Sequence, residues 1–218
     1  MRLSHKYRFI FFSFPKTGSE SVRSVLDPIA DVRGRQVEHL GGARGGDLVI
    51  PDHVTPAELR LVFRERGWPF EEYYRFVFVR NPWSRLVSLY RHIRGVNPGF
   101  HTPFDEWLLN SRPNSRGGGE EGENVARFRR FGAYALDNFI CDDNGVRLVS
   151  EVFRLEDMPG IPEKLRLKGI PVNVDFMPAI NRPPPVDVNQ YYPAPALRAV
   201  VAMRYAKDIA EFRYQYPG

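Results

Sequence analysis

The sequence predicts an α/β fold in which helices surround a mostly parallel sheet. Short apolar runs alternate with segments of helical periodicity, which is the pattern of repeated strand–loop–helix units. The clearest strands are the runs at 8–14, 74–79 and 149–155. In parallel sheets, ligands bind beyond the carboxyl ends of the strands. Functional residues are therefore expected in the segments that follow Phe14 and Val79.

The first strand–loop–helix unit lies at the start of the chain. Residues 8–14 (RFIFFSF) form an almost continuous apolar run, as expected for a buried strand. Residues 19–26 (SESVRSVL) place their three apolar side chains on one side of a helix. Residues 33–46 are rich in Gly and Arg and are predicted to form a loop, and residues 48–50 a short strand.

A second unit is centred on the apolar run at 74–79 (YRFVFV). Before it, Thr55 followed by Pro and by Glu three residues on predicts the capped start of a helix that runs to Arg66. After it, Asn-Pro ends the strand, and a helix is expected over 84–94.

The rest of the chain is less regular. Residues 112–123 (RPNSRGGGEEGE) are polar and Gly-rich, so they form either a lid over a site or an inserted loop, and an insertion is preferred. A helix is expected over 128–140. A single final helix is expected over 194–212, where apolar residues recur at helical spacing. No internal repeat is visible.

Length and composition predict one globular domain over residues 1–218. Hydrophobic residues make up 43% and charged residues 26% of the chain, which excludes a wholly disordered protein. The single cysteine, Cys141, excludes an intramolecular disulfide framework and a cluster of cysteines around a metal. No residues with metal-ligand spacing are seen, so no metal is expected.

The charge is basic, with 31 Lys+Arg against 26 Asp+Glu. Most of these cations are arginines, which suit phosphate, sulfate and carboxylate groups, although codon bias would produce the same excess. No long basic run is present, so nucleic acid is not an expected partner. The apolar run at 9–14 is too short to span a membrane, which predicts a soluble, cytoplasmic chain. A lumenal domain separated from its membrane anchor would share these features.

The loop Pro15-Lys16-Thr17-Gly18-Ser19-Glu20-Ser21 joins the first strand to a helix N-terminus. The N–H groups there are unpaired within the helix, and the helix dipole favours an anion. Gly18 permits a close backbone approach, Lys16 adds a charge, and three hydroxyl groups add donors. These features indicate a phosphate or sulfate site, and a tight turn with an exposed lysine is the alternative. The GxxxxGK[ST] spacing of nucleotide hydrolases is absent.

A second loop follows the strand at 74–79 and reads RNPWSRLVSLY. Arg80 stands at the end of the strand, and Ser84 and Ser88 share one side of the expected helix. A guanidinium beside a helix hydroxyl can bind an anion, whereas a surface ion pair and an ordinary helix cap would also explain these residues. The presence of both loops favours anion binding.

Together, FPKTGSES and VRNPWSRLVSLY resemble the paired signature of sulfotransferases that use 3′-phosphoadenosine 5′-phosphosulfate (PAPS). Four further segments resemble the family 2-like branch that sulfates carbohydrates, namely Asp52-His53-Val54-Thr55, VFRLED at 152–157, MPAINR at 177–182 and the closing Asp208…Phe212-Arg213-Tyr214. The likeness spans most of the chain, except 33–46 and 112–123. It implies a P-loop-NTPase-like three-layer fold with a central, mostly parallel sheet flanked by helices.

The resemblance also implies roles for cofactor-binding residues. The first loop, from Pro15 to Ser21, would hold the 5′-phosphosulfate, and Arg80 and Ser88 would hold the 3′-phosphate. Asn181 and Arg182 would contact the cofactor through a closing loop.

Two catalytic roles are implied as well. Lys16 would stabilise the charge that develops on the leaving oxygen. His53 stands where the carbohydrate branch has its general base, and a histidine titrates near the working pH. Glu38 and His39 are the alternative bases, because another branch uses a Glu after the first helix.

Glu20 departs from the family pattern, which usually has a small hydroxyl residue at this position. A carboxylate that pointed at a sulfate would repel it. Residues Thr17-Gly18-Ser19-Glu20 match a capping box, in which Glu20 would turn back to the N-cap amide. This capping role is the preferred interpretation.

The sequence therefore predicts an enzyme that transfers the sulfuryl group of PAPS to a hydroxyl acceptor, with a saccharide as the expected class, by in-line displacement. A nucleotide kinase-like phosphoryl transferase is one alternative, but it needs a Walker lysine and a Mg-binding aspartate that the sequence does not show. A non-catalytic nucleotide-binding module is the other, and Glu20 is its best support.

Overall fold

The structure is a computed structural model that describes residues 1–34, 37–39, 47–111, 133–175, 177–180 and 186–218, with only the backbone described at 37–39 and 47–49. The chain divides into two compact units. Unit 1 comprises Met1–Val79 and Ile140–Arg182, and unit 2 comprises Arg80–Phe139 and Pro183–Gly218. The single domain over 1–218 remains a prediction.

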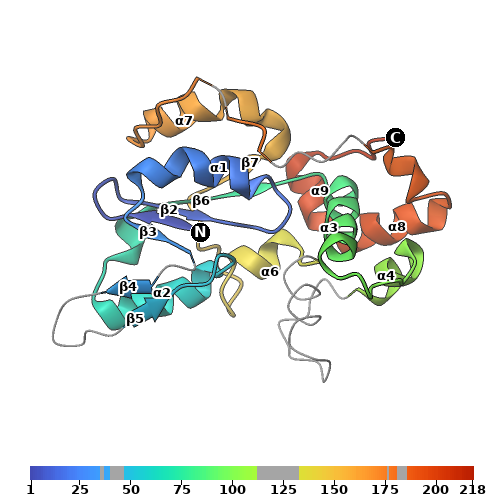
Figure 1. The fold of residues 1–218 in the computed structure, drawn as a ribbon, viewed down its shortest axis with the longest axis horizontal. Helices are drawn as coiled ribbons and strands as arrows, with labels where there is room; N and C mark the ends of the chain where they lie inside the picture. The colour runs from blue at the N-terminus through green and yellow to red at the C-terminus, as the bar shows by residue number, and fades with distance from the viewer. Residues whose placement is uncertain (35–36, 40–46, 112–132, 176, 181–185) are drawn as a thin grey trace. The chain divides into compact units, whose positions relative to one another are not determined.

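Unit 1 is built on a five-stranded sheet with the order β3-β1-β2-β6-β7 (Figure 1). Its strands are β1 (Arg2–Ser4), β2 (Phe9–Phe12), β3 (Val32–Arg33), β6 (Tyr74–Val79) and β7 (Glu151–Arg154). β2, β6 and β7 pair in parallel, while β1 is antiparallel to both of its neighbours. Four of the five strands thus run in one direction, which confirms the predicted mostly parallel sheet.

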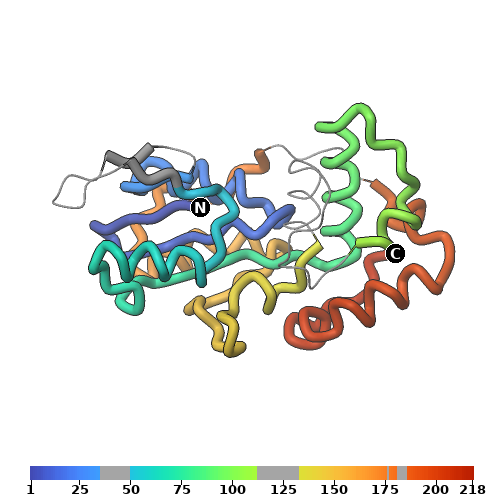
Figure 2. Tube along the Cα trace, turned by 90° about the horizontal axis from the view of Figure 1, so that it is seen from below, coloured from blue at the N-terminus to red at the C-terminus, as the bar shows by residue number. Residues whose placement is uncertain are grey.

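Helices cover both faces of this sheet. α1 and α7 lie on one face and α2 lies on the other (Figure 1), and Figure 2 shows the unit from the α2 side. The remaining elements of unit 1 are α1 (Ser19–Leu26), η1 (Asp27–Ile29), β4 (Val37–His39), β5 (Asp47–Val49), α2 (Pro56–Arg66), η2 (Phe70–Glu72), η3 (Leu155–Gly160) and α7 (Ile161–Leu167). The predicted three-layer α/β architecture is confirmed.

The core of unit 1 follows from the alternation of side chains along the strands. Phe9 and Phe11 of β2, with Phe76 and Phe78 of β6, are fully buried in one cluster with side chains of α1 and α7. Ile10, Phe12 and Val77 are buried as well, because α2 covers the opposite face. Burial of both faces explains why these strands are apolar runs rather than alternating ones.

Unit 2 is helical. Its elements are α3 (Pro82–Val96), α4 (Phe104–Asn110), α6 (Leu136–Ile140, which ends at the first residue of the next segment of unit 1), η4 (Val188–Gln190), α8 (Pro195–Arg204) and α9 (Ala206–Phe212). Tyr90 of α3 packs against Phe104 and Trp107 of α4 and against Tyr191. Trp107 is therefore a core residue. Among the described helices, none combines the length and the apolar character that a membrane crossing requires.

Some predicted elements differ from the structure. Val37–His39 form β4 and pair with β5, where a loop was expected. The predicted helix at 128–140 is helical only over Leu136–Ile140 in its described part. The single final helix is two helices, because Tyr205 leaves the helical conformation (φ −116°, ψ 27°). Its buried hydroxyl donates to the carbonyl of Ala133 at 2.5 Å, so packing overrides the continuous helical periodicity.

Candidate functional site

The first predicted anion-binding loop, residues 15–21, follows the carboxyl end of β2. Lys16 and Gly18 both have left-handed backbone conformations, with φ of 65° and 76°. At Gly18 this conformation is easily adopted, whereas at Lys16 it costs about 1 kcal/mol. A Cβ at residue 18 would also lie 2.6 Å from Cδ1 of Leu155, so this leucine side chain would have to move to admit any other residue. Among the described residues, no hydrogen-bond partner is found for the amides of Thr17, Gly18 and Ser19. The loop thus presents N–H groups at the start of α1, as anion-binding nests do.

The loop hydroxyls act differently from one another. Thr17 and Ser19 donate to the carbonyl oxygen of Phe14, at 2.8 and 3.1 Å, and both side chains are buried. These two hydroxyls hold the loop in its folded shape. Ser21 instead accepts a hydrogen bond from the backbone N–H of Ile180 at 3.1 Å. An accepting hydroxyl still has its own proton to donate, so Ser21 has the capacity to bind an anion as well.

The capping-box interpretation of Glu20 is wrong. Helix α1 has Gly18 as its N-cap, and glycine has no side chain that could accept from the helix. Thr17 therefore stands one residue before the N-cap, because left-handed Gly18 starts the helix. Glu20 is about half exposed, at 49%, and its carboxylate lies 3.7 Å from the guanidinium of Arg23. Its charge is thus partly compensated.

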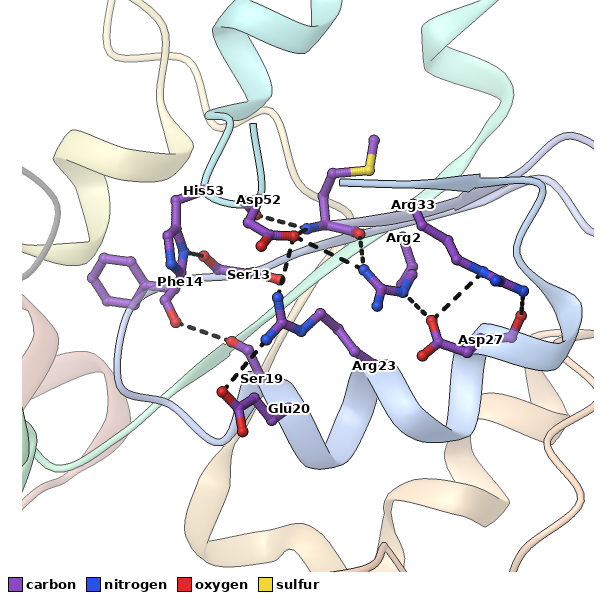
Figure 3. Close-up of polar contacts among 11 residues, drawn as sticks. Arg2, Ser13, Phe14, Ser19, Glu20, Arg23, Asp27, Arg33, Asp52 and His53 are labelled. Carbon is purple, nitrogen blue, oxygen red and sulfur yellow. Dashed lines mark hydrogen bonds and ion pairs between the residues drawn. The ribbon is translucent and has the colours of Figure 1, made fainter. Parts of the chain in front are cut away.

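His53 lies beside the start of the first loop (Figure 3). Its Nδ1 lies 2.7 Å from the carbonyl oxygen of Ser13. Because a carbonyl only accepts, Nδ1 carries the proton and the lone pair is on Nε2. Burial lowers the pKa of His53, and the bond to Ser13 opposes that shift. The imidazole is therefore neutral near pH 7, which is the state that a general base requires.

The helix α2, which begins shortly after His53, helps to fix the position of this residue. The capping box predicted at the start of α2 is confirmed, since Thr55 accepts from the amide of Glu58 and Glu58 accepts from the amide of Thr55. The start of α2 is therefore well defined two residues after His53, which lies between this cap and the carboxyl end of β2.

Several predicted residues are described incompletely. Glu38 and His39 lie in β4, for which the structure describes only the backbone. Asn181 and Arg182 lie outside the described residues, as does the segment 112–123. The neighbouring Ile180 is nevertheless bound to Ser21, so the segment that leads to Asn181 reaches the first loop.

The second predicted loop starts unit 2. Arg80 is half-buried, and the side chain of Asn81 caps α3 by accepting from the amide of Ser84 at 3.4 Å. Ser84 and Ser88 are half-buried residues of α3 and are four positions apart, so they share one side of the helix as predicted. By contrast, Arg85 is almost fully buried and donates to the carbonyl of Tyr134 at 2.5 Å.

A buried charged group in unit 2 was not predicted from the sequence. Asp208 is 3% exposed and accepts from the amide of Leu136 at 3.1 Å. Burial raises the pKa of Asp208 to about 6, although the nearby Arg85 opposes the shift. The guanidinium of Arg85 also lies over the ring of Tyr205. In the sequence Asp208 stands between Lys207 and Ile209. The family resemblance includes this residue, but no local signal indicates that it is buried beside Arg85.

The raised pKa predicts a pH-dependent stability. The folded protein binds the proton of Asp208 more tightly than the unfolded chain does, so this group lowers the free energy of unfolding as pH rises from about 4 to about 6. The expected loss is about 3 kcal/mol. Asp208→Asn should remove this dependence in denaturant unfolding at pH 4, 5, 6 and 7. The matched control is Asp105→Asn, at an exposed carboxylate of α4. Parallel profiles for wild type and Asp208→Asn would contradict the assignment.

No three His, Cys, Asp or Glu side chains in the described part of the chain are close enough to hold a metal ion. Unit 1 places the backbone N–H groups of residues 17–19 at the start of α1, and His53 lies beside this loop. The helix face with Ser84 and Ser88 is in unit 2.

Comparisons with known proteins point to one family. Carbohydrate sulfotransferase 14 of Mus musculus and that of Homo sapiens are each 26% identical to this chain over 135 residues, which is 62% of this chain and 34% of each relative. The chain thus spans about a third of the length of these curated relatives. The crystal structure of a sulfotransferase from Alicyclobacillus acidocaldarius has a TM-score of 0.50 at 17% identity, covers 96% of this chain and 97% of its own, and shows a similar fold.

The decisive match is to a family model, and it confirms the family that the two loops resemble. The model described as the sulfotransferase family matches residues 1–155, which include the first loop, His53 and the second loop. This is well over half of the chain, and the chain therefore belongs to the sulfotransferase family.

Proposed function

We propose that this protein transfers the sulfuryl group of PAPS to a hydroxyl group of a saccharide. Membership of the sulfotransferase family supports sulfuryl transfer, and the names of the two curated relatives support a carbohydrate acceptor. The observation that carries the proposal is the 2.7 Å contact between His53 and Ser13. Through this contact the imidazole of His53 lies against Ser13, which is three residues before Lys16 in the chain. His53 is therefore beside the loop that is suited to an anion.

The first loop has the donor set that a phosphosulfate requires. Oxyanions are bound by backbone N–H groups at helix N-termini, and the amides from Thr17 to Ser19 supply such groups. Lys16 adds a positive charge, and the left-handed backbone of Lys16 and Gly18 shapes the concavity. When bound, PAPS supplies an activated sulfuryl group. We assign Pro15, Lys16, Thr17, Gly18, Ser19, Glu20 and Ser21 to this loop.

Each catalytic residue has one proposed task. Nε2 of His53 accepts the proton of the acceptor hydroxyl as its oxygen bonds to sulfur. Lys16 stabilises the negative charge on the phosphate oxygen that leaves sulfur, in the same way as a lysine acts on a leaving phosphate. The products are a sulfate ester and adenosine 3′,5′-bisphosphate, and the charges and atoms balance without another reactant.

The remaining cofactor contacts are assigned to Arg80, Ser88, Asn181 and Arg182. Support for Arg80 comes from sheet topology, since β2 and β6 are parallel neighbours and the chain leaves the same edge of the sheet after each. Arg80 is bonded to the last residue of β6. Support for Asn181 and Arg182 comes from the contact between Ser21 and Ile180.

A melting experiment tests donor binding. Adenosine 3′,5′-bisphosphate at 100 times its dissociation constant should stabilise the protein by about 2.7 kcal/mol, whereas ATP at the same concentration should shift the Tm little. The difference is expected because ATP has no 3′-phosphate. Equal shifts with both nucleotides would contradict a dedicated site for the 3′-phosphate.

Transfer itself is tested with radiolabelled PAPS and a panel of saccharides, including uronic-acid and already sulfated sugars, whose negative charge suits the arginine-rich chain. Label in a saccharide product is the expected result. A protein that binds the bisphosphate but labels no hydroxyl compound would be a non-catalytic module, and the proposal would be wrong.

A further inference from the structure

An ion network joins the first-loop helix to the segment that carries His53 (Figure 3). The guanidinium of Arg23, on α1, lies 3.2 Å from the carboxylate of Asp52 and 3.7 Å from that of Glu20. Asp52 is the residue before His53, and Glu20 belongs to the first loop. A single arginine is therefore paired with one carboxylate of each part of the proposed site.

The pair of Arg23 and Asp52 is shielded from solvent. Their side chains are 18% and 13% exposed, so salt screens their attraction less than that of a surface pair. The position of Asp52 is also restricted by its neighbours. Its backbone carbonyl accepts from the nitrogen of Met1 at 2.6 Å. A Cβ at Gly34 would lie 2.5 Å from its carboxylate, which shows how closely the backbone there approaches.

The network sets the charges that His53 experiences. Burial has the largest effect and lowers the pKa of His53. The hydrogen bond to Ser13 and the carboxylate of Asp52 raise this pKa, whereas the nitrogen of Met1 and, to a smaller extent, Arg23 lower it. Arg2, on β1, lies 4.0 Å from the same Asp52 carboxylate. Arg23 thus offsets a carboxylate that would otherwise favour the protonated imidazole.

We propose that Arg23 is a positioning residue for sulfuryl transfer, which holds the carboxylate of Glu20 away from the bound donor and compensates the charge of Asp52, the residue before the base His53. This inference rests on the proposed function. By pairing with Glu20, Arg23 strengthens the binding of the donor. By pairing with Asp52, it lowers the pKa of His53. Glu20 is tolerated in an anion-binding loop because Arg23 lies one helical turn after it.

The experiment compares Arg23→Gln with wild type in two measurements. NMR titration of His53 in the free protein should show a higher pKa in the variant, because Asp52 is less compensated. Calorimetry should show about threefold to fivefold weaker binding of adenosine 3′,5′-bisphosphate, since Glu20 then repels the phosphate. Arg23→Lys should resemble wild type in both. The matched control is Arg33→Gln, since Arg33 pairs with Asp27 at the other end of α1.

A double variant separates the two effects. Adding Glu20→Gln to Arg23→Gln should restore bisphosphate affinity to within about twofold of wild type, while the pKa of His53 stays raised. An unchanged His53 titration in Arg23→Gln, or weak binding that Glu20→Gln does not restore, would overturn the proposal. If Arg23→Gln does not fold, Asp52→Asn replaces it. That variant should shift the pKa of His53 in the opposite direction, downward, and an unchanged pKa would again overturn the proposal.

The two measurements also distinguish this inference from the proposed function. The His53 titration needs no nucleotide and no activity. A wild-type protein that does not bind the bisphosphate would contradict the proposed function, while the titration would still decide whether Arg23 acts on His53.

Discussion

Replacement of Lys16 with alanine should reduce kcat by about 100-fold or more, because the leaving oxygen loses the positive charge that stabilises it. The measurement is turnover with radiolabelled PAPS at saturating donor and acceptor. Binding of adenosine 3′,5′-bisphosphate should weaken much less, because the backbone N–H groups from Thr17 to Ser19 remain. The matched control is Lys6→Ala, which removes an exposed lysine before the amino end of β2. Normal turnover in Lys16→Ala would contradict the role of this side chain.

Lys16→Gly should separate stability from activity. The lysine is held at a φ of 65°, which glycine adopts without strain, and this relief is worth about 1–2 kcal/mol. Glycine also gives the unfolded chain more conformational freedom, which costs about 0.4–1 kcal/mol, so the free energy of unfolding should stay equal to that of wild type or rise by up to about 1 kcal/mol. Its turnover should fall as in the alanine variant. Arg8→Gly is the matched control, because Arg8 also has a positive φ, of 48°, but lies before β2. That variant should keep its turnover. A Lys16→Gly protein that is destabilised by about 1 kcal/mol, the full entropic cost of a glycine, would show that the lysine backbone is not strained.

Replacement of His53 with alanine should lower kcat by about 100-fold to 10,000-fold, since the acceptor hydroxyl loses its general base. The wild-type rate should rise as His53 loses its proton and level off above its pKa, which burial places below the ordinary value for histidine. The variant should lack this acidic limb. Bisphosphate binding should be largely retained, since the amides from Thr17 to Ser19 belong to the loop and not to His53.

An exposed histidine provides the control for this result. His101→Ala should turn over as wild type does, with the same pH profile. If His53→Ala also turns over normally, the base is another residue, and Glu38 and His39 become the next variants to measure. The family assignment and the fold would survive that outcome, because neither depends on His53.

Local sequence signals located β2, α1, β5, α2, β6 and β7 of unit 1, but not β1, β3, β4 or α7. The predicted helix at 19–26 and the strand at 74–79 agree with α1 and β6, and the capping box of α2 is present. These elements depend on apolar periodicity, β-branched and aromatic content, or a cap within four residues. β1 and β3 were missed because strands of three and two residues carry almost no periodicity.

Glu20 shows where local pattern fails. Its spacing from Thr17 matches a capping box. However, the N-cap is the left-handed Gly18, one residue after Thr17, and the carboxylate of Glu20 pairs with Arg23. The break at Tyr205 is a similar case, since a buried hydroxyl bond to Ala133 interrupts a periodicity that continues through it. In both, a specific tertiary or backbone interaction outweighs the preference of the segment.

By itself, the sequence determined the α/β class, the positions of the two loops that follow strands β2 and β6, and the family, because each of these is recorded in short contiguous segments. Only the tertiary structure decided that His53 lies on Ser13, that Arg23 is paired with both Glu20 and Asp52, and that Asp208 is buried. The reason is physical. His53 and Ser13, like Arg23 and Asp52, are far apart in the chain and meet only when their segments pack together. The burial of Asp208 is likewise defined only by that packing, as is the compensation of one charge by another.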